Sequence, residues 1–215
     1  MTTRPDAATL EALKRCGAAT IHESQGQRGA VDPAIKPLSS AMRVAGPALT
    51  VKCKPGDNLV LHYALLKAQP GDVLVVDYEG FSSSGPWGDV MTLAAKTRGI
   101  AGLAIDGTVR DSTSIVEMGF PVFSRGACIK GTNKYQPGSV GIPLVFGGVL
   151  VNPGDIVVGD GDGLVVIDQH EVAAVLAAAE AREAKEEGVR KRILAGTTTV
   201  EILGVQDLLA KYGMT

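Results

Sequence analysis

Charged residues mark both ends of a short βα unit in a chain whose apolar stretches contain few charges. The unit is WGDVMTLAAKTRGIAGLAIDGTVRD, residues 87–111, and the residues in question are Asp89, Asp106, Arg110 and Asp111. Such groups need water, partners or a ligand. An arginine can bind a small carboxylate with two parallel hydrogen bonds. A hard cation such as Mg²⁺ takes oxygen ligands and keeps several waters, so a single aspartate can be enough to hold it.

These residue types together suit chemistry on a 2-keto acid. A bound cation can polarise the 2-keto oxygen and stabilise an enolate. A second carboxylate can hold a water molecule for proton transfer. The alternative is that these residues have only a structural role, in which Asp89 caps a helix and Arg110 pairs with Asp111 or Asp106. The residues alone leave both interpretations open.

The elements around these residues would bring them together. A helix is expected over 89–98, after the Gly- and Ser-rich loop EGFSSSGPWG. The first amides of a helix have no partner within it and suit a carboxylate. The strand 100–105 ends in the turn GTVRD, and ligands of α/β sheets sit beyond the carboxyl ends of strands. The amides that we expect at the substrate carboxylate are those of Gly88, Asp89, Val90 and Met91.

The remaining pattern predicts one layered α/β domain over residues 1–215. Helices are expected at 7–16, 56–68 (with Asp57 or Asn58 as N-cap), 111–118, about 170–195 and near 205–211. Strands are expected at 43–53 and 121–124, and residues 69–77 form a turn followed by a buried strand. Residues 140–168 read as short β segments separated by Gly, Pro and Asp. No linker divides the chain, so the β segments should lie centrally and the helices outside.

Composition narrows the class of protein. The formal net charge is −2, which does not favour a nucleic-acid surface. The three cysteines form no C-x-x-C pair, which fits a reducing compartment. The N-terminus has no apolar secretion signal, and no apolar run approaches the roughly 20 residues that span a bilayer. We therefore expect a soluble, cytoplasmic protein without a membrane or nucleic-acid partner.

Three other motifs do not favour a site. GDGDGL (159–164) precedes a strand, whereas a dinucleotide loop opens a helix, which also argues against a methyltransferase. The three histidines lack metal-ligand spacing. Lys52 is a candidate for a Schiff-base lysine, but with Lys54 it reads as a solvated strand face.

The stretch 87–111 resembles the family of 4-hydroxy-4-methyl-2-oxoglutarate and 4-carboxy-4-hydroxy-2-oxoadipate aldolases. The resemblance rests on Asp89 followed after twenty residues by Arg110-Asp111, on PVFSRG (121–126) and on PGDIVVGDGDGLVVI (153–167). It covers roughly residues 15 to 195. The regulator of ribonuclease activity A proteins share that fold.

The resemblance implies a swivelling β/β/α fold, with trimers or dimers of trimers. It also implies a class II aldolase that uses Mg²⁺, Mn²⁺ or another divalent cation and releases pyruvate from a 4-hydroxy-2-oxo acid, with oxaloacetate decarboxylation as a side activity. Arg110 would bind the substrate, Asp111 would hold the metal, and Asp89 would position the proton-donating water. The alternative is a non-catalytic regulator. That subgroup is expected to lack the aspartate at position 89, so its presence favours an enzyme.

The resemblance further places an acidic residue from a neighbouring subunit in the site. Glu186 and Glu187, on the expected C-terminal helix, are both candidates. Physically, the charged second half of that helix is equally compatible with a solvated face, held by Glu186–Arg190 and Glu187–Lys191 pairs. The alternative is that the extension over 170–215 makes oligomer contacts.

Overall fold

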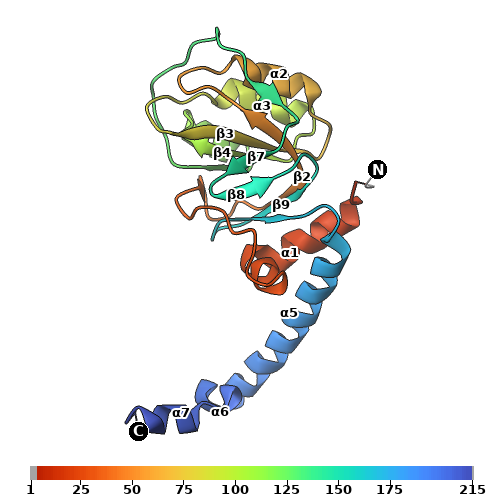
Figure 1. Cartoon of the computed structure of the whole chain (residues 1–215), viewed down its shortest axis with the longest axis vertical. Helices are drawn as coiled ribbons and strands as arrows, with labels where there is room; N and C mark the ends of the chain where they lie inside the picture. The colour runs from red at the N-terminus through yellow and green to blue at the C-terminus, as the bar shows by residue number, and fades with distance from the viewer. Residues whose placement is uncertain (1–3, 215) are drawn as a thin grey trace.

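An eight-stranded mixed sheet forms the centre of the protein (Figure 1). The computed structural model describes residues 4–214. The sheet order is β1-β5-β4-β3-β2-β9-β10, and β6 pairs with β2. The strands are β1 (Lys36–Pro37), β2 (Val44–Lys52), β3 (Val73–Phe81), β4 (Gly102–Gly107), β5 (Val122–Ser124), β6 (Ser139–Val140), β9 (Ile156–Gly159) and β10 (Leu164–Ile167). A separate hairpin consists of β7 (Leu144–Phe146) and β8 (Val149–Val151).

The strands β2, β3, β4 and β5 are parallel neighbours. Parallel strands need crossover connections, which are usually helices. Here they are α2 (Leu59–Lys67), α3 (Asp89–Thr97) and α4 (Ser112–Glu117). The carboxyl ends of these strands meet at one edge of the sheet, so the segments that follow β4 and β5 lie close together there. The bridge between Val109 and Ala127 shows this contact.

A curled sheet with helices outside it confirms the predicted layered α/β class of swivelling β/β/α type. One core cluster lies between the parallel strands and α2, α3 and α4. A second cluster lies between these strands and the β7–β8 hairpin. The third joins β9 and β10 to α1 (Ala7–Ser24) and the first part of α5 (Val172–Leu194).

Helix α1 is longer than the predicted 7–16, because a kink lets it continue. Gly17 adopts φ 79°, which favours glycine. A Cβ at Gly17 would lie 2.9 Å from Asp160 Oδ2. The same carboxylate accepts a hydrogen bond from the Ala18 amide at 2.8 Å and so caps the second half of the helix. The sequence prediction missed this half because its cap comes from 142 residues away.

The C-terminal segment leaves the body of the protein. Only Val172, Val175 and Ala179 of α5 are buried, and α6 (Thr199–Leu203) and α7 (Gln206–Lys211) bury no residue. Figure 1 shows α5 leading away from the sheet and ending beyond α1. Helix α6 was not predicted, although the capping box of Thr198 and Glu201 is its sequence signal. Within residues 4–214, no helix is both long and apolar enough to cross a membrane.

Candidate active site at the start of helices α3 and α4

The loop before α3 is fixed by buried side chains. Trp87 is completely buried, and its indole Nε1 donates to Thr92 Oγ1 at 2.8 Å. The Thr92 hydroxyl in turn donates to the Gly88 carbonyl at 2.9 Å. Gly88 occupies the N-cap position and Asp89 is the first helical residue, so the structural alternative in which Asp89 caps the helix is wrong. These contacts set the direction in which the N-terminus of α3 points.

The turn after β4 carries Arg110 and Asp111 to the same place. The Arg110 amide donates to the Trp87 carbonyl at 2.8 Å. Asp111 precedes α4 with φ 56°, a left-handed conformation uncommon outside glycine. Such strain clusters at functional sites. A Cβ added at Gly88 would lie 2.4 Å from Asp111 Oδ2 and 3.1 Å from Arg110 Nε. Only glycine therefore lets the two helix starts approach so closely.

The polar groups of the two helix starts contact one another. Asp111 Oδ2 accepts a hydrogen bond from the Asp89 amide at 3.3 Å and lies 3.4 Å from Arg110 Nε. The Val90 amide donates to Asp89 Oδ1 at 2.7 Å. Two of the four predicted amides thus already face a carboxylate, whereas all four were expected to be unpaired. Met91 is buried, so only its backbone can serve a ligand.

Asp106 does not belong to this group. Its carboxylate accepts a hydrogen bond from Arg125 Nε, while Arg125 Nη2 contacts Asp32 Oδ2 at 2.7 Å. These two carboxylates, Asp106 first, raise the pKa of Arg125. The suggested Arg110–Asp106 pair is therefore wrong, while the Arg110–Asp111 pair is present. It is an open pair, because the side chains are 46% and 39% exposed.

The carboxylates at the two helix starts suit a divalent cation that keeps most of its water ligands, rather than one that is bound by protein ligands alone. Among the described residues, no group of three or more His, Cys, Asp or Glu side chains is placed to hold a metal ion. Mg²⁺ keeps several waters and is commonly bound through one or two carboxylates. The exposed Asp111 carboxylate, which packs directly against Gly88 at the start of α3, offers one such ligand.

The sequence is similar to those of known proteins over most of its length. The sequence model of the RraA-like family, described as Aldolase/RraA, matches residues 8–166. The chain belongs to the RraA-like family. It is 40% identical over 159 residues to a Halalkalibacterium halodurans protein named "Putative 4-hydroxy-4-methyl-2-oxoglutarate aldolase", covering 74% of this chain and 76% of that protein.

Two solved structures have the same fold as this chain. An uncharacterized protein from Pseudomonas syringae superposes with a TM-score of 0.83 at 30% identity, over 92% of this chain and 93% of the other. RraAS2 from Streptomyces coelicolor, called an unusual member of the RNase ES inhibitor RraA protein family, gives 0.78 at 33% identity, over 88% and 100%. The family therefore includes proteins named for an aldolase and proteins named for inhibition of a ribonuclease.

The two candidate acids of this RraA-like chain lie on the part of α5 that leaves the body. Glu186 contacts Arg182 at 3.0 Å and Arg190 at 3.3 Å, and Glu187 contacts Lys191 at 3.8 Å. Both predicted i,i+4 pairs are thus present. Within one chain, α5 packs on α1 rather than on α3 or α4. The structure of a single chain therefore does not bring either glutamate to Arg110.

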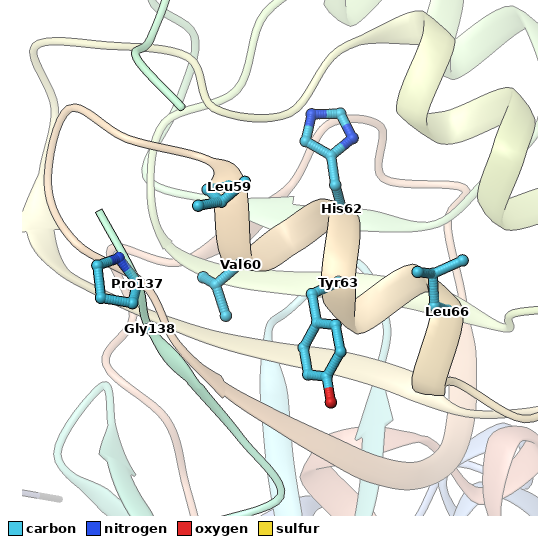
Figure 2. A pocket seen from close by; sticks show the side chains of 7 residues that line it. All are labelled: Leu59, Val60, His62, Tyr63, Leu66, Pro137 and Gly138. Carbon is cyan, nitrogen blue, oxygen red and sulfur yellow. The ribbon is translucent and has the colours of Figure 1, made fainter. Parts of the chain in front are cut away.

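An apolar hollow of about 460 Å³ lies elsewhere, on α2 (Figure 2). It is lined by Leu59, Val60, His62, Tyr63, Leu66, Pro137 and Gly138. Burial, and then the charge of Lys134, lower the pKa of His62. This lining offers no arginine or carboxylate and includes none of the predicted site residues. It suits an apolar contact and not a keto acid with a carboxylate.

Lys52 does not have the environment of a Schiff-base lysine. Its Nζ lies 2.6 Å from Asp77 Oδ2 and 3.0 Å from Glu79 Oε1. Burial alone would lower the pKa of Lys52, but the hydrogen bonds to these two carboxylates outweigh burial and raise it. A nucleophilic lysine needs a lowered pKa. The structure thus agrees with the sequence argument against Lys52, although the reason is ion pairing and not only solvation.

The sequence analysis missed the residues that support the site. Trp87, Thr92 and Thr108 are buried and hydrogen-bonded to the loop before α3 or within it. Asn58 was considered only as a helix cap, yet its side chain donates to the Pro86 carbonyl at 2.9 Å. One available signal was the position of Trp87, the only tryptophan in the chain, directly before the predicted site.

Proposed function

We propose that this protein is a divalent-metal-dependent class II aldolase that cleaves a 4-hydroxy-2-oxo mono- or dicarboxylic acid to pyruvate and a second keto acid, with oxaloacetate decarboxylation as a side activity. The observation that carries the proposal is the open Arg110–Asp111 pair directly beside the N-terminus of α3. A guanidinium, helix amides and an exposed carboxylate are what a 2-keto carboxylate and a hard cation require. The 40% identity to a protein named for this aldolase supports it.

Arg110 and the start of α3 would bind the pyruvate part of the substrate. The substrate carboxylate would accept hydrogen bonds from Gly88, Asp89, Val90 or Met91 amides. Two of these amides now donate to Asp111 and Asp89. Substrate binding would exchange these internal acceptors for the substrate carboxylate, so breaking the two internal hydrogen bonds offsets part of the binding energy. Arg110 needs no such exchange of backbone bonds, because its guanidinium is half exposed.

Asp111 would hold the cation, Mg²⁺ or Mn²⁺. When bound, the cation would polarise the 2-keto oxygen and favour the enolate form of pyruvate. Cleavage would pass the proton of the 4-hydroxyl to the water that Asp89 holds, break the C3–C4 bond to leave a carbonyl at C4, and leave the electron pair of that bond on the pyruvate enolate. Asp89 would hold the water that returns a proton to C3. For oxaloacetate, the bond broken is the one to the departing CO₂, and the same water would protonate C3.

The site would be completed in a homotrimer or dimer of trimers by Glu186 or Glu187 of an adjacent chain. Two features support an oligomer. Helix α5 carries these residues beyond the body of its own chain. Helices α2 and α3 also expose large apolar side chains, namely Leu59, Tyr63, Leu66, Val90 and Leu93.

Subunit exchange tests this arrangement. Arg110→Ala and a Glu186→Ala/Glu187→Ala double variant are unfolded and refolded together. If the glutamates act across the interface, some sites in mixed oligomers combine an intact Arg110 with an intact α5, and activity recovers to a minority fraction of wild type. Activity that stays at background contradicts the cross-subunit role, as does full activity of the double-glutamate variant alone.

Pyruvate release decides between the enzyme and its rival. The rival is a non-catalytic regulator, favoured by the name of the Streptomyces relative. The purified protein is incubated with oxaloacetate and with 4-hydroxy-4-methyl-2-oxoglutarate, with Mg²⁺ and with EDTA, and pyruvate is measured. The proposal expects Mg²⁺-dependent release well above the uncatalysed rate. Release at the background rate with every substrate of a 4-hydroxy-2-oxo acid panel would favour the regulator.

A further inference from the structure

Asn58 joins the start of α2 to the loop before α3. It is only 7% exposed. Its Nδ2 donates to the Pro86 carbonyl at 2.9 Å and lies 3.8 Å from Met91 Sδ. It occupies the N-cap position of α2 but makes no side-chain cap bond there. The side chain therefore serves the loop before α3 rather than the helix that it precedes.

Most backbone carbonyls of the loop 84–88 accept a hydrogen bond that fixes their orientation. The Thr108 hydroxyl donates to the Ser84 carbonyl at 2.7 Å. The Trp87 carbonyl accepts from the Arg110 amide and the Gly88 carbonyl from the Thr92 hydroxyl. Asn58 supplies the bond to Pro86, which lies between these anchors. When the carbonyls of a segment are turned toward the protein, the orientation of each peptide, and hence of its amides, is fixed.

Asn58 keeps this bond at a cost. Its Oδ1 is buried and has no hydrogen-bond partner among the described residues. A buried polar atom without a partner costs roughly 1–3 kcal/mol. Reversing the amide would place Oδ1 against the Pro86 carbonyl, so the present orientation is the only one that gives the loop a donor. A leucine of similar size would remove this cost but would leave the Pro86 carbonyl without its donor, so the bond to the loop is what the buried amide provides.

We propose that Asn58 is a positioning residue that fixes the loop 84–88 and thereby aims the first amides of α3 at the bound carboxylate. This assignment rests on the proposed function for its catalytic consequence. Its structural part, the clamping of the loop, can be measured separately. The buried indole of Trp87 lies next to Pro86 and is the only tryptophan of the chain, so its fluorescence reports on this loop alone.

The test compares Asn58→Leu with Gln25→Leu. Gln25 is an equally buried amide, 7% exposed, whose Nε2 donates to the Arg28 and Val166 carbonyls away from the site. Thermal unfolding, Trp87 emission with acrylamide quenching, and kcat and KM for oxaloacetate are measured on both. We expect Asn58→Leu to unfold no earlier than Gln25→Leu, to show red-shifted and more easily quenched emission, and to lose about tenfold to a hundredfold in kcat/KM.

The control should keep wild-type fluorescence and kcat/KM even if its melting temperature falls. The assignment is overturned if Asn58→Leu keeps both the wild-type shielding of Trp87 and a kcat/KM within about twofold of wild type. If Asn58→Leu does not fold, Asn58→Asp, which keeps the shape and replaces the donor by an acceptor, is measured by the same criteria. If wild type releases no pyruvate, the proposed function fails, while the Trp87 readout still supports or refutes the clamp.

Discussion

Arg110 and Arg125 each follow a strand of the parallel sheet, β4 and β5, yet their environments differ. Arg125 is 23% exposed and contacts two carboxylates, Asp106 and Asp32. Arg110 is 46% exposed, and its guanidinium pairs with Asp111 at 3.4 Å. Two carboxylates of its own chain therefore hold the first guanidinium. The second has donors left for a ligand.

The difference shows that position at the carboxyl edge of a sheet does not by itself make a binding residue. Both arginines satisfy the general rule for ligand sites in α/β sheets. What separates them is the number of carboxylates that the chain itself supplies, two to the more buried Arg125 and one to the half-exposed Arg110. We therefore assign Arg125 to the scaffold and Arg110 to the candidate site, and four substitutions test this difference.

Asp111→Ala should have the largest effect. Removal of the proposed metal ligand should abolish Mg²⁺-dependent pyruvate release. The fold should survive, because the aspartate at the start of α4 makes no side-chain cap bond, and alanine at this left-handed φ costs only about 1–2 kcal/mol. Steady-state assays over a range of Mg²⁺ concentrations, with circular dichroism, check this. A variant that stays active with an unchanged Mg²⁺ requirement would show that Asp111 does not hold the metal.

Arg110→Lys should reduce kcat/KM by about a hundredfold or more, although the charge is kept. Lysine cannot form the two parallel hydrogen bonds by which a planar guanidinium binds a carboxylate. The loss should appear with every substrate, since all share the pyruvate carboxylate. The melting temperature should stay near that of wild type, because the Arg110–Asp111 pair is exposed and such pairs contribute little. Near-normal kcat/KM would assign Arg110 to the scaffold instead.

The same change at the other arginine, Arg125→Lys, should act on stability. Lysine cannot contact Asp106 and Asp32 with the same fork of donors, and hydrogen bonds to charged groups contribute about 1.5–3 kcal/mol. Urea unfolding should show a loss of that order, while kcat/KM changes far less than in Arg110→Lys. Unchanged stability together with a large catalytic loss would remove the distinction between the two arginines.

Asp32→Asn should give the smallest effect, a small loss of stability at neutral pH that disappears as the pH falls below about 4. Backbone hydrogen bonding from Ala34, followed by Arg125, lowers the pKa of Asp32. A carboxyl with a lowered folded pKa contributes stability above its unfolded value of about 3.9, and this contribution is lost as pH falls through the folded pKa. Wild-type stability should therefore fall more steeply below pH 4 than that of the variant. Parallel curves of unfolding free energy against pH would contradict this.

The grouping of the candidate site residues could be predicted because these residues are close together in the sequence. Asp89, Arg110 and Asp111 flank one βα unit, and strand and helix periodicity place both helix starts at the same edge of the sheet. The overall layering followed from the same patterns. Local order of this kind depends on short-range rules, such as turn residues and apolar spacing.

The contacts that were not predicted join distant parts of the chain. Asp106 pairs with Arg125 and not with its near neighbour Arg110, because β5 lies beside β4. Asn58 reaches Pro86, 28 residues away, and the second half of α1 depends on Asp160. No periodicity encodes such partners. They follow from the sheet order, which the sequence patterns alone did not specify.

Binding of pyruvate, measured by calorimetry on wild type, Arg110→Lys and Arg125→Lys in Mg²⁺ and in EDTA, tests most directly whether Arg110 is the arginine that binds the ligand. We predict that wild type and Arg125→Lys bind pyruvate with similar affinity in Mg²⁺, and that EDTA weakens the binding. Arg110→Lys should show no measurable binding under either condition. The assignment of Arg110 as the ligand-binding arginine would be contradicted if Arg110→Lys bound pyruvate at wild-type affinity, or if binding were lost only in Arg125→Lys.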